Sequence, residues 1–307
     1  MPRTDRFSGV LTPVITPFDE DLEPNPESLI RQCRWLLSQD VGLAVFGTNS
    51  EANSMSVSEK KDLLTRLVEA GIDPGRLMPG TGCSALTDSV ELTRHAVSLG
   101  CAGVLMLPPF YYKGVSDDGL YRNYAEIISR VGSDALRIYL YHIPPVAQVG
   151  LSLDLVERLV HDFPEVVAGI KDSSGDWDNS QAMLERQWDD FRVFVGSETL
   201  LLRNMRAGGA GCISATANIN PGAIVRLYRD WQADDADEKQ GQLDDIRAIA
   251  QAYPMIPALK AIAAHYSGDP SWRHVRPPLT PLTAAAATEL LHRLEQHGFE
   301  MPGLGNA

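Results

Sequence analysis

The chain has 307 residues, of which 44% are hydrophobic, and its 27 Lys and Arg against 40 Asp and Glu give a formal net charge of −13. This charge argues against nucleic acid or an anionic membrane as the main partner, because both require a positively charged footprint. The N-terminus has prolines and acids where a secretory signal needs an apolar segment, and no apolar run reaches about 18 residues. We therefore expect a cytoplasmic protein with no membrane span.

Cysteine and histidine spacing gives no sign of a metal site. The four cysteines occur singly, without a CxxC pair, and the seven histidines show neither HxH nor HExxH spacing. We expect reduced, mostly buried thiols, and we expect chemistry that uses neither a metal nor a cofactor.

Eight short apolar runs recur along the first 216 residues. Each is bounded by Gly, Pro or Asp and is apolar on successive residues, a pattern typical of parallel strands that are buried on both faces. The runs span residues 10–18, 42–48, 77–83, 103–110, 138–144, 166–174, 191–197 and 210–216.

Segments with helical spacing separate these runs. Examples are residues 26–39, 57–70, 87–100, 151–163 and 198–209. Ser56 and Glu59 have the spacing of a capping box, and Gly100 and Gly208 stand where a helix C′ residue belongs. Eight strand–helix alternations predict a (β/α)8 TIM barrel, with an open doubly wound sheet as the alternative.

The sequence changes character beyond residue 232. Three helical segments follow one another without an intervening strand run. We therefore divide the chain into a catalytic barrel, residues 1–232, and a C-terminal α-helical region, residues 233–307, that forms a three-helix extension.

The active site of such a barrel lies at the carboxyl ends of its strands. Lys171 follows the apolar run VVAGI there, whereas the other five lysines lie in helical or loop segments where a solvated ammonium is expected. Burial favours the neutral amine, which is a nucleophile able to form a Schiff base with a carbonyl compound. The alternative is a structural pair with Asp172 or another carboxylate.

Tyr141, in the fifth run, is a suitable proton shuttle beside an amine nucleophile, although core packing is the commoner role of a strand tyrosine. Thr48 and Asn49, in GTNSE, offer a hydroxyl, an amide and backbone N–H groups that can hold a carboxylate; the alternative is a simple turn.

His142 is expected to be a core histidine or a substrate contact. The glycines of RAGGAG precede the eighth strand and are therefore expected on the opposite face of the barrel.

GTNSE, PFYY, YHIP and GIKDSSGD occur in the order and spacing of the dihydrodipicolinate synthase / N-acetylneuraminate lyase superfamily, which the chain resembles from about residue 7 to its C-terminal helices. The resemblance implies a metal-free (β/α)8 barrel with a C-terminal helical region, commonly a homotetramer, a dimer of dimers. It also implies a pyruvate-type Schiff base with a 2-keto acid.

The resemblance also assigns roles. Lys171 matches the Schiff-base lysine, Tyr141 the proton-transfer tyrosine and Thr48 the hydroxyl residue that relays its protons. Tyr111 resembles the relay tyrosine that reaches into a neighbouring subunit's site, with Tyr112 as the alternative if the alignment shifts.

Three further residues are implied as substrate contacts. Asn49 stands where a second Thr commonly binds the pyruvyl carboxylate, and Ser173 belongs to the same motif as Lys171. Ile213, in GCISA, resembles the residue whose backbone lies against the pyruvyl group.

The chain departs from the family at positions that select the substrate. Val146 stands where dihydrodipicolinate synthases have an arginine that binds the aldehyde's carboxylate. Glu198, Thr199 and Ala215 stand where sialic-acid lyases hold the sugar chain, and only one of them fits. The turn resembles that of 4-hydroxy-2-oxoglutarate-type and other sugar-acid-derived aldolases, although Ser50 replaces a usual glycine.

We therefore expect a metal-independent Schiff-base lyase acting on pyruvate or a pyruvate-derived 2-keto acid. The alternatives are a 4-hydroxy-tetrahydrodipicolinate synthase or a keto-deoxy sugar-acid dehydratase on the same scaffold, and, more remotely, a non-catalytic keto-acid-binding protein.

Overall fold

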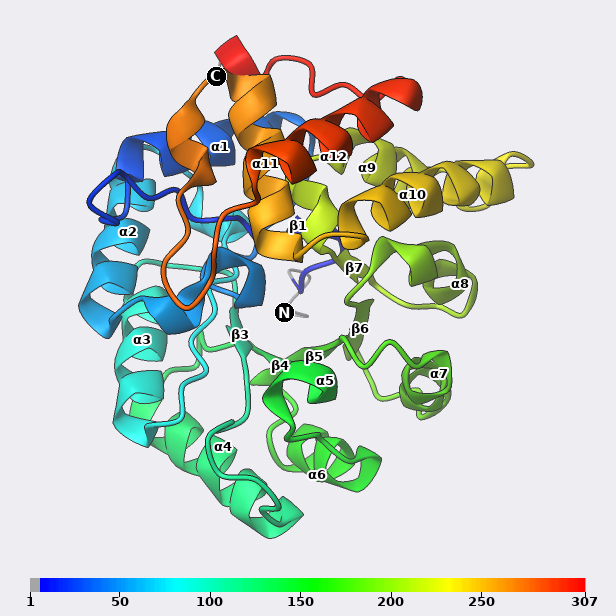
Figure 1. Cartoon of the computed structure of the whole chain (residues 1–307). Helices are drawn as coiled ribbons and strands as arrows, with labels where there is room; N and C mark the ends of the chain where they lie inside the picture. Colours follow the sequence, from blue (N-terminus) through cyan, green and yellow to red (C-terminus); the bar gives the residue numbers. More distant parts are fainter. Residues whose placement is uncertain (1–5, 307) are drawn as a thin grey trace.

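The computed structural model describes residues 6–306, and in it a ring of parallel strands is surrounded by helices (Figure 1). The strands form one sheet in the order β2-β1-β7-β6-β5-β4-β3. They are β1 Gly9–Thr12, β2 Gly42–Leu43, β3 Val104–Met106, β4 Ile138–His142, β5 Val167–Asp172, β6 Arg192–Val195 and β7 Gly211–Ile213.

Residues 77–81 close the ring between β2 and β3. The Met78 N–H donates to the Leu43 carbonyl at 2.8 Å, and the Thr81 N–H donates to the Leu105 carbonyl at 3.0 Å. Pro79, in the middle of the segment, has no N–H to contribute to a ladder. The segment therefore forms single bridges rather than a regular strand. Seven of the predicted runs correspond to the strands of the sheet, and the eighth, the bridged segment, closes the barrel wall. The predicted (β/α)8 barrel is confirmed.

The helices lie around the ring and over part of its carboxyl edge. They are α1 Pro26–Ser38, α2 Val57–Glu69, α3 Leu86–Ser98, α4 Asp117–Val131, α5 Pro144–Ala147, α6 Leu153–Asp162, α7 Trp177–Glu185, α8 Leu201–Arg206, α9 Pro221–Arg229, α10 Ala236–Gln251, α11 Met255–Ser267 and α12 Ala284–Gln296. Of these, α1, α2 and α3 begin within one residue of the predicted starts. Short 3₁₀ turns named below are η1 Thr48–Ser50, η2 Ala52–Ser54, η4 Glu198–Leu200, η5 Ala215–Asn218 and η6 Pro270–Arg273.

Local signals at the helix ends behave as the sequence predicts, with one exception. Ser56 and Glu59 form the capping box of α2. Gly100 and Gly208 follow α3 and α8 with φ of 80° and 87°. The prediction of one helix over 198–209 is wrong, because the segment begins as the 3₁₀ turn η4 and becomes α-helical only at Leu201.

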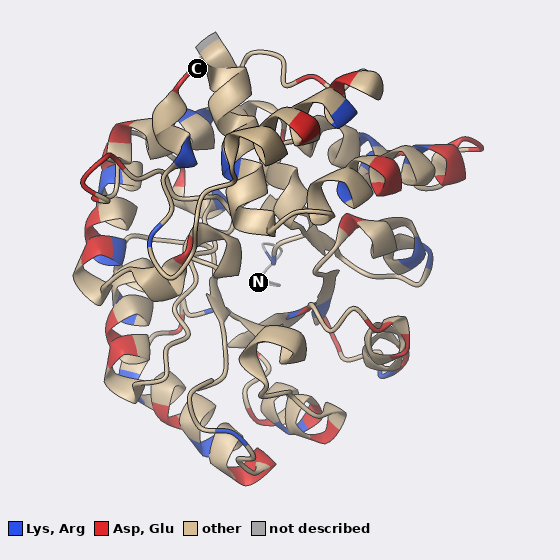
Figure 2. Ribbon diagram, viewed as in Figure 1, with Lys and Arg blue, Asp and Glu red and all other residues tan. Residues whose placement is uncertain are grey.

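The core has two layers. Side chains that point into the barrel form an inner cluster, and a larger cluster lies between the barrel and the helices. Charged residues lie mainly on the outer helices and loops (Figure 2). The inner cluster comprises Leu11, Ala44, Met78, Leu105, Tyr139, Tyr141, Ala168, Phe194, Ala210 and Ile213.

A β-bulge in β5 sets the register of the strands that carry the predicted site. Ile138 faces Val167, but the next residue of β4, Tyr139, faces Gly169, so β5 has one additional residue at this point. Position 169 requires glycine, because a Cβ there would overlap the Arg192 carbonyl oxygen and lie 2.9 Å from a ring carbon of Tyr139. As a result Tyr141 faces Lys171.

The three predicted C-terminal helices are present as α10, α11 and α12. α10 packs against α8 and α9, whereas α11 packs against η1 and η5, two turns that follow the carboxyl ends of strands. This region therefore covers part of the edge where the site is expected. The division of the chain at residue 232 stays a prediction. Within residues 6–306, no helix is both long and apolar enough to cross a membrane.

Candidate active site

Lys171 is enclosed at the carboxyl end of β5, where 2% of the residue is exposed. Its Nζ donates to the Tyr141 hydroxyl at 3.2 Å and lies 4.3 Å from the centre of the Tyr141 ring. A buried amine needs such a partner, since an unpaired polar group in the interior is costly.

Asp172 does not pair with Lys171, so the Asp172 part of the structural alternative is wrong. Its carboxylate accepts hydrogen bonds from the Ser180 hydroxyl at 2.6 Å and the Asn179 amide at 3.0 Å. Both donors lie on α7, on the outer side of the strand. Asp172 therefore ties α7 to β5 and leaves the amine of Lys171 to Tyr141.

Tyr141 connects Lys171 to the turn after β2. Its hydroxyl lies 3.2 Å from Thr48 Oγ1, and either oxygen can be the donor. The three groups form a chain, Lys171 Nζ to Tyr141 OH to Thr48 Oγ1, along which a proton can pass in steps of hydrogen-bond length. The structure thus brings together the three residues that the sequence singles out for chemistry.

The predicted substrate contacts lie near this chain in different ways. Ile213 is fully buried in the inner cluster that also contains Tyr141. Asn49 follows Thr48 directly and is partly buried. The Ser173 N–H donates to the His142 carbonyl at 2.7 Å, and its Oγ lies so close to Gly196 that a Cβ there would overlap it. Neither Asn49 nor Ser173 hydrogen-bonds to Lys171, Tyr141 or Thr48 in the structure. Their roles stay predictions.

Within one polypeptide chain, Tyr111 does not join the group formed by Lys171, Tyr141 and Thr48. It is 74% exposed, and its ring packs edge-on against Tyr112 at a centroid distance of 5.3 Å. Tyr112 is 66% exposed, so both tyrosines project from the loop before α4. A role of either residue in a neighbouring subunit stays a prediction.

The prediction that the five other lysines are solvated is wrong for two of them. Lys60, on α2, is 5% exposed and lines a small crevice together with Thr48 and Tyr141. Lys260, on α11, is completely buried. Helical spacing alone did not distinguish these lysines from solvated ones. Their environment comes from other segments of the chain.

Lys260 pairs with Glu51, the last residue of GTNSE, and both side chains are fully buried. The Glu51 carboxylate also accepts a hydrogen bond from the Arg276 N–H at 2.9 Å. Burial lowers the pKa of Lys260 to about 8, although the carboxylate of Glu51 opposes that shift. A hydrogen bond from the Arg276 guanidinium lowers the pKa of Glu59 to about 2.

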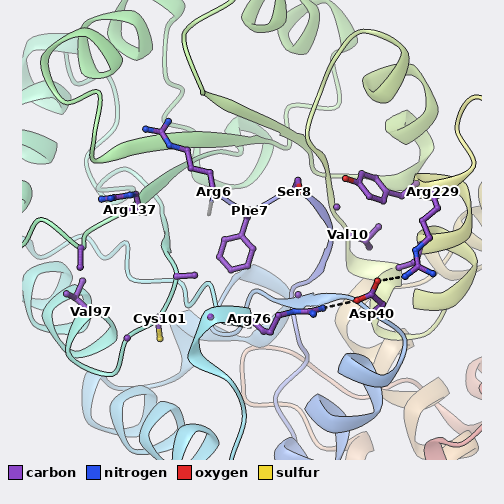
Figure 3. Close-up of a pocket in the computed structure, with 18 residues that line it drawn as sticks. Arg6, Phe7, Ser8, Val10, Asp40, Arg76, Val97, Cys101, Arg137 and Arg229 are labelled. Atoms are coloured by element: carbon purple, nitrogen blue, oxygen red, sulfur yellow. Dashed lines mark hydrogen bonds and ion pairs between the residues drawn. The ribbon is translucent and has the colours of Figure 1, made fainter. Parts of the chain in front are cut away.

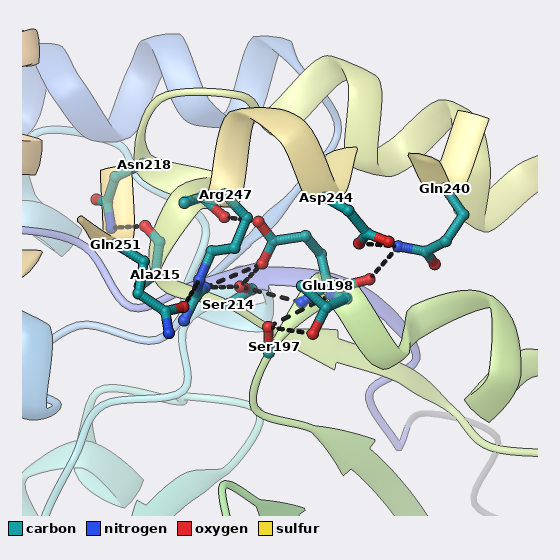
Figure 4. Close-up of polar contacts among 11 residues, drawn as sticks. Ser197, Glu198, Ser214, Ala215, Asn218, Gln240, Asp244, Arg247 and Gln251 are labelled. Atoms are coloured by element: carbon teal, nitrogen blue, oxygen red, sulfur yellow. Dashed lines mark hydrogen bonds and ion pairs between the residues drawn. The ribbon is translucent and has the colours of Figure 1, made fainter. Parts of the chain in front are cut away.

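A second buried ion pair lies where β6 and β7 end (Figure 4). Glu198 is 1% exposed and lies 3.1 Å from the Arg247 guanidinium of α10. The carboxylate also accepts hydrogen bonds from the hydroxyls of Ser214 and Thr216. Gln240 donates to the Glu198 carbonyl at 2.9 Å, so α10 is held to this edge at two points. Glu198 was noted as a sugar-binding position, but its carboxylate is occupied by these partners.

A cavity of about 830 Å³ lies at the opposite end of the barrel (Figure 3). Arg76 and Arg229 line it and both bond to Asp40. The RAGGAG segment leads into the same end, where Gly211 faces Gly9. The predicted location of these glycines on the opposite face of the barrel is confirmed.

Among residues 6–306, no group of three or more His, Cys, Asp and Glu side chains is arranged to hold a metal ion.

The fold and this site define a (β/α)8 barrel with a buried lysine and a phenol hydrogen-bonded at its carboxyl edge. Residues 6–297 match the model of the dihydrodipicolinate synthetase family. The chain therefore belongs to that family, whose members are enzymes that form or cleave carbon–carbon bonds.

Individual relatives agree with this assignment. An uncharacterized DapA-like lyase of Chloroflexus aurantiacus is 32% identical over 90% of this chain and 92% of its own. The dihydrodipicolinate synthase structure from Agrobacterium tumefaciens is 31% identical and superposes with a TM-score of 0.87, over 94% of this chain and 98% of its own. YagE of Escherichia coli K12, a prophage protein of the same family solved with pyruvate, is 25% identical with a TM-score of 0.85, over 95% and 99%.

His142 provides a test of the electrostatics next to the site. Its Nδ1 accepts a hydrogen bond from the Leu151 N–H at 2.9 Å, which requires a ring nitrogen without a proton. Burial lowers the pKa of His142, although Asp172 opposes the shift. The structure thus favours the core role over the substrate contact.

We predict that His142 titrates below the ordinary histidine pKa of about 6.5 in the folded protein. Its neutral form is favoured by folding, so the stability it contributes is present above pH 6.5 and is lost as the pH falls towards its folded pKa. NMR titration of the histidine ring protons measures this. A His142 that titrates at or above about 6.5 would contradict the prediction.

Proposed function

We propose that this protein is a metal-independent lyase of the class I aldolase type that acts on pyruvate or a pyruvate-derived 2-keto acid. Candidate substrates are 4-hydroxy-2-oxoglutarate and keto-deoxy sugar acids. The observation that carries the proposal is the buried amine of Lys171, hydrogen-bonded to Tyr141 at 3.2 Å. The pyruvate bound to YagE, a relative with the same fold, supports the same substrate class.

In the proposed reaction, the neutral Lys171 amine attacks C2 of the keto acid. Tyr141 gives a proton to the resulting carbinolamine hydroxyl, and water leaves to form the iminium. As the C3–C4 bond breaks, the Tyr141 phenolate takes the proton of the C4 hydroxyl and the iminium accepts the electron pair of that bond, so that an aldehyde departs and an enamine remains. Protonation at C3 and hydrolysis release pyruvate and the free amine. Thr48 relays protons to and from Tyr141.

The remaining predicted residues bind the substrate in this scheme. Asn49 and Ser173 hold the carboxylate of the keto acid, and the backbone of Ile213 lies against its pyruvyl portion. The scheme requires neither a metal nor a cofactor. The complete set of Lys171, Tyr141 and Thr48 disfavours a non-catalytic keto-acid-binding protein, which would be free to lose one of them.

A 4-hydroxy-tetrahydrodipicolinate synthase or a keto-deoxy sugar-acid dehydratase on the same scaffold is the second candidate. The synthases among the relatives favour the first of these. Against it, Val146 stands on α5 where an arginine is expected to bind the aldehyde's carboxylate, and it is 61% exposed. No cation replaces that arginine in the residues that directly follow YHIP.

We also propose that the chain acts in the cytoplasm as a homotetramer, a dimer of dimers. Tyr111, Tyr112, Val115 and Val146 are the exposed large hydrophobic residues of the described chain. A second copy packed on the two tyrosines would bury them, and Tyr111 would then extend the proton relay of the partner's site.

We predict that a panel of 2-keto acids and aldehydes, with coupled detection of pyruvate, will identify a 4-hydroxy-2-keto acid as the substrate cleaved fastest. Condensation of pyruvate with aspartate semialdehyde should be slower by one to two orders of magnitude, since a charged contact contributes about 2–3 kcal/mol. Condensation at the rate of a dedicated synthase, measured beside the panel, would reverse this order and favour the second candidate.

We predict that Tyr141→Phe lowers kcat by about 10²–10⁴, the usual contribution of a positioned acid–base group, and leaves the melting temperature and KM close to wild type. Thr48→Val should give a smaller defect of the same kind. The matched control is Tyr139→Phe, which removes another buried hydroxyl from the same strand. Full activity of the Tyr141→Phe protein would reduce Tyr141 to a packing residue, and the relay assigned to Thr48 would be wrong as well.

A further inference from the structure

Thr48 lies on a turn whose conformation the barrel alone does not fix. The turn η1 ends at Glu51, which has a φ of 57° and also precedes η2. A left-handed conformation is unfavourable for a residue with a side chain and persists only where the surroundings hold it. From the barrel, the Thr16 hydroxyl donates to the Ser50 carbonyl at 2.7 Å, and the Tyr141 hydroxyl lies 3.2 Å from Thr48 Oγ1.

Further contacts to this turn come from the C-terminal region. The fully buried Glu51 carboxylate pairs with Lys260 of α11, and it accepts a hydrogen bond from the Arg276 N–H at 2.9 Å. Arg276 also donates through Nη1 to the Ser54 carbonyl at 2.8 Å, so that it holds η2 as well.

Lys260 is itself fixed in place. Its Nζ donates to the His274 carbonyl at 2.6 Å and lies 4.4 Å from the centre of the Phe18 ring. A buried ion pair resists displacement, because separating its two groups leaves an unpaired charge in the interior. The pair therefore transmits the position of α11 to Glu51.

Thr48 lies three residues before Glu51, and the Glu51 N–H donates to the Thr48 carbonyl at 3.2 Å. A shift of Glu51 therefore moves the backbone that carries the Thr48 hydroxyl. That hydroxyl must stay within hydrogen-bond reach of Tyr141 for a proton to pass.

We propose that the buried Glu51–Lys260 ion pair is a positioning device through which the C-terminal helices hold the Thr48 hydroxyl against Tyr141. Glu51 and Lys260 are positioning residues and touch no substrate. The inference rests on the proposed function, since it concerns the relay of that reaction, and it gives the C-terminal region a part in catalysis.

The test uses pyruvate as the probe, so that the second substrate need not be known. Proton transfer through the enamine exchanges the pyruvate methyl protons for deuterium in D2O, which NMR follows as a rate. Reduction with borohydride reports separately how much Schiff base has formed. The main variant is Glu51→Gln/Lys260→Met, which removes both charges and keeps the volume. The matched control is Lys61→Met, the same change at a partly exposed position of α2.

We expect the Glu51→Gln/Lys260→Met protein to exchange about tenfold or more slowly than wild type, with an unchanged yield of the borohydride adduct. Adding Thr48→Val to it should lower the rate little further, although Thr48→Val alone lowers it clearly, because both changes act through one hydroxyl. Lys61→Met should behave as wild type.

Exchange at the wild-type rate in the folded double variant, or a full additional loss on adding Thr48→Val, would overturn the inference. If the double variant does not fold, Glu51→Asp carries the same expectations, because it keeps both charges and shortens the side chain that holds the turn. Failure of the proposed function is a different outcome: the wild-type protein would then show neither adduct nor exchange.

Discussion

One additional residue in β5 is the constraint on which the candidate site depends. Ala168 forms the bulge that separates the pair Ile138–Val167 from the pair Tyr139–Gly169. If the strands continued in the first register, Ile170 would face Tyr141 and Lys171 would point toward the outer helices. A shift of one residue reverses the direction of every side chain that follows, so the bulge determines that the amine lies inside the barrel.

The burial of that amine explains why polar partners surround it at the carboxyl edge. Lys171 needs a polar partner, and Tyr141 provides one from the adjacent strand; Tyr141 in turn meets Thr48. Two buried ion pairs, Glu51–Lys260 and Glu198–Arg247, connect this edge to α11 and α10. The C-terminal helices are therefore tied to the turns of the carboxyl edge by charges that cannot separate without loss of stability.

Local patterns in the sequence were sufficient for the barrel and for the position of the candidate residue Lys171. The apolar runs predicted all eight segments of the barrel wall. Because Lys171 lies near the end of one of these runs, its location at the carboxyl edge could be predicted as well. The buried state of Lys260 could not be predicted in this way, because its partner Glu51 is distant in sequence and only the folded chain brings them together. The burial of Lys60 could not be predicted for the same reason, because helical spacing does not indicate which segments pack around a helix. Helical spacing also did not distinguish the 3₁₀ turn η4 from the α-helix that begins at Leu201.

Borohydride reduction in the presence of pyruvate, followed by peptide mapping, tests most directly whether Lys171 is the nucleophile. The account predicts one adduct per chain, with the mass of one reduced pyruvyl group, on the peptide that contains Lys171. Lys60 and Lys260 should remain unmodified although both are buried, and Lys171→Met should abolish the adduct. An adduct on another lysine with Lys171 free, or no adduct at saturating pyruvate, would contradict the account.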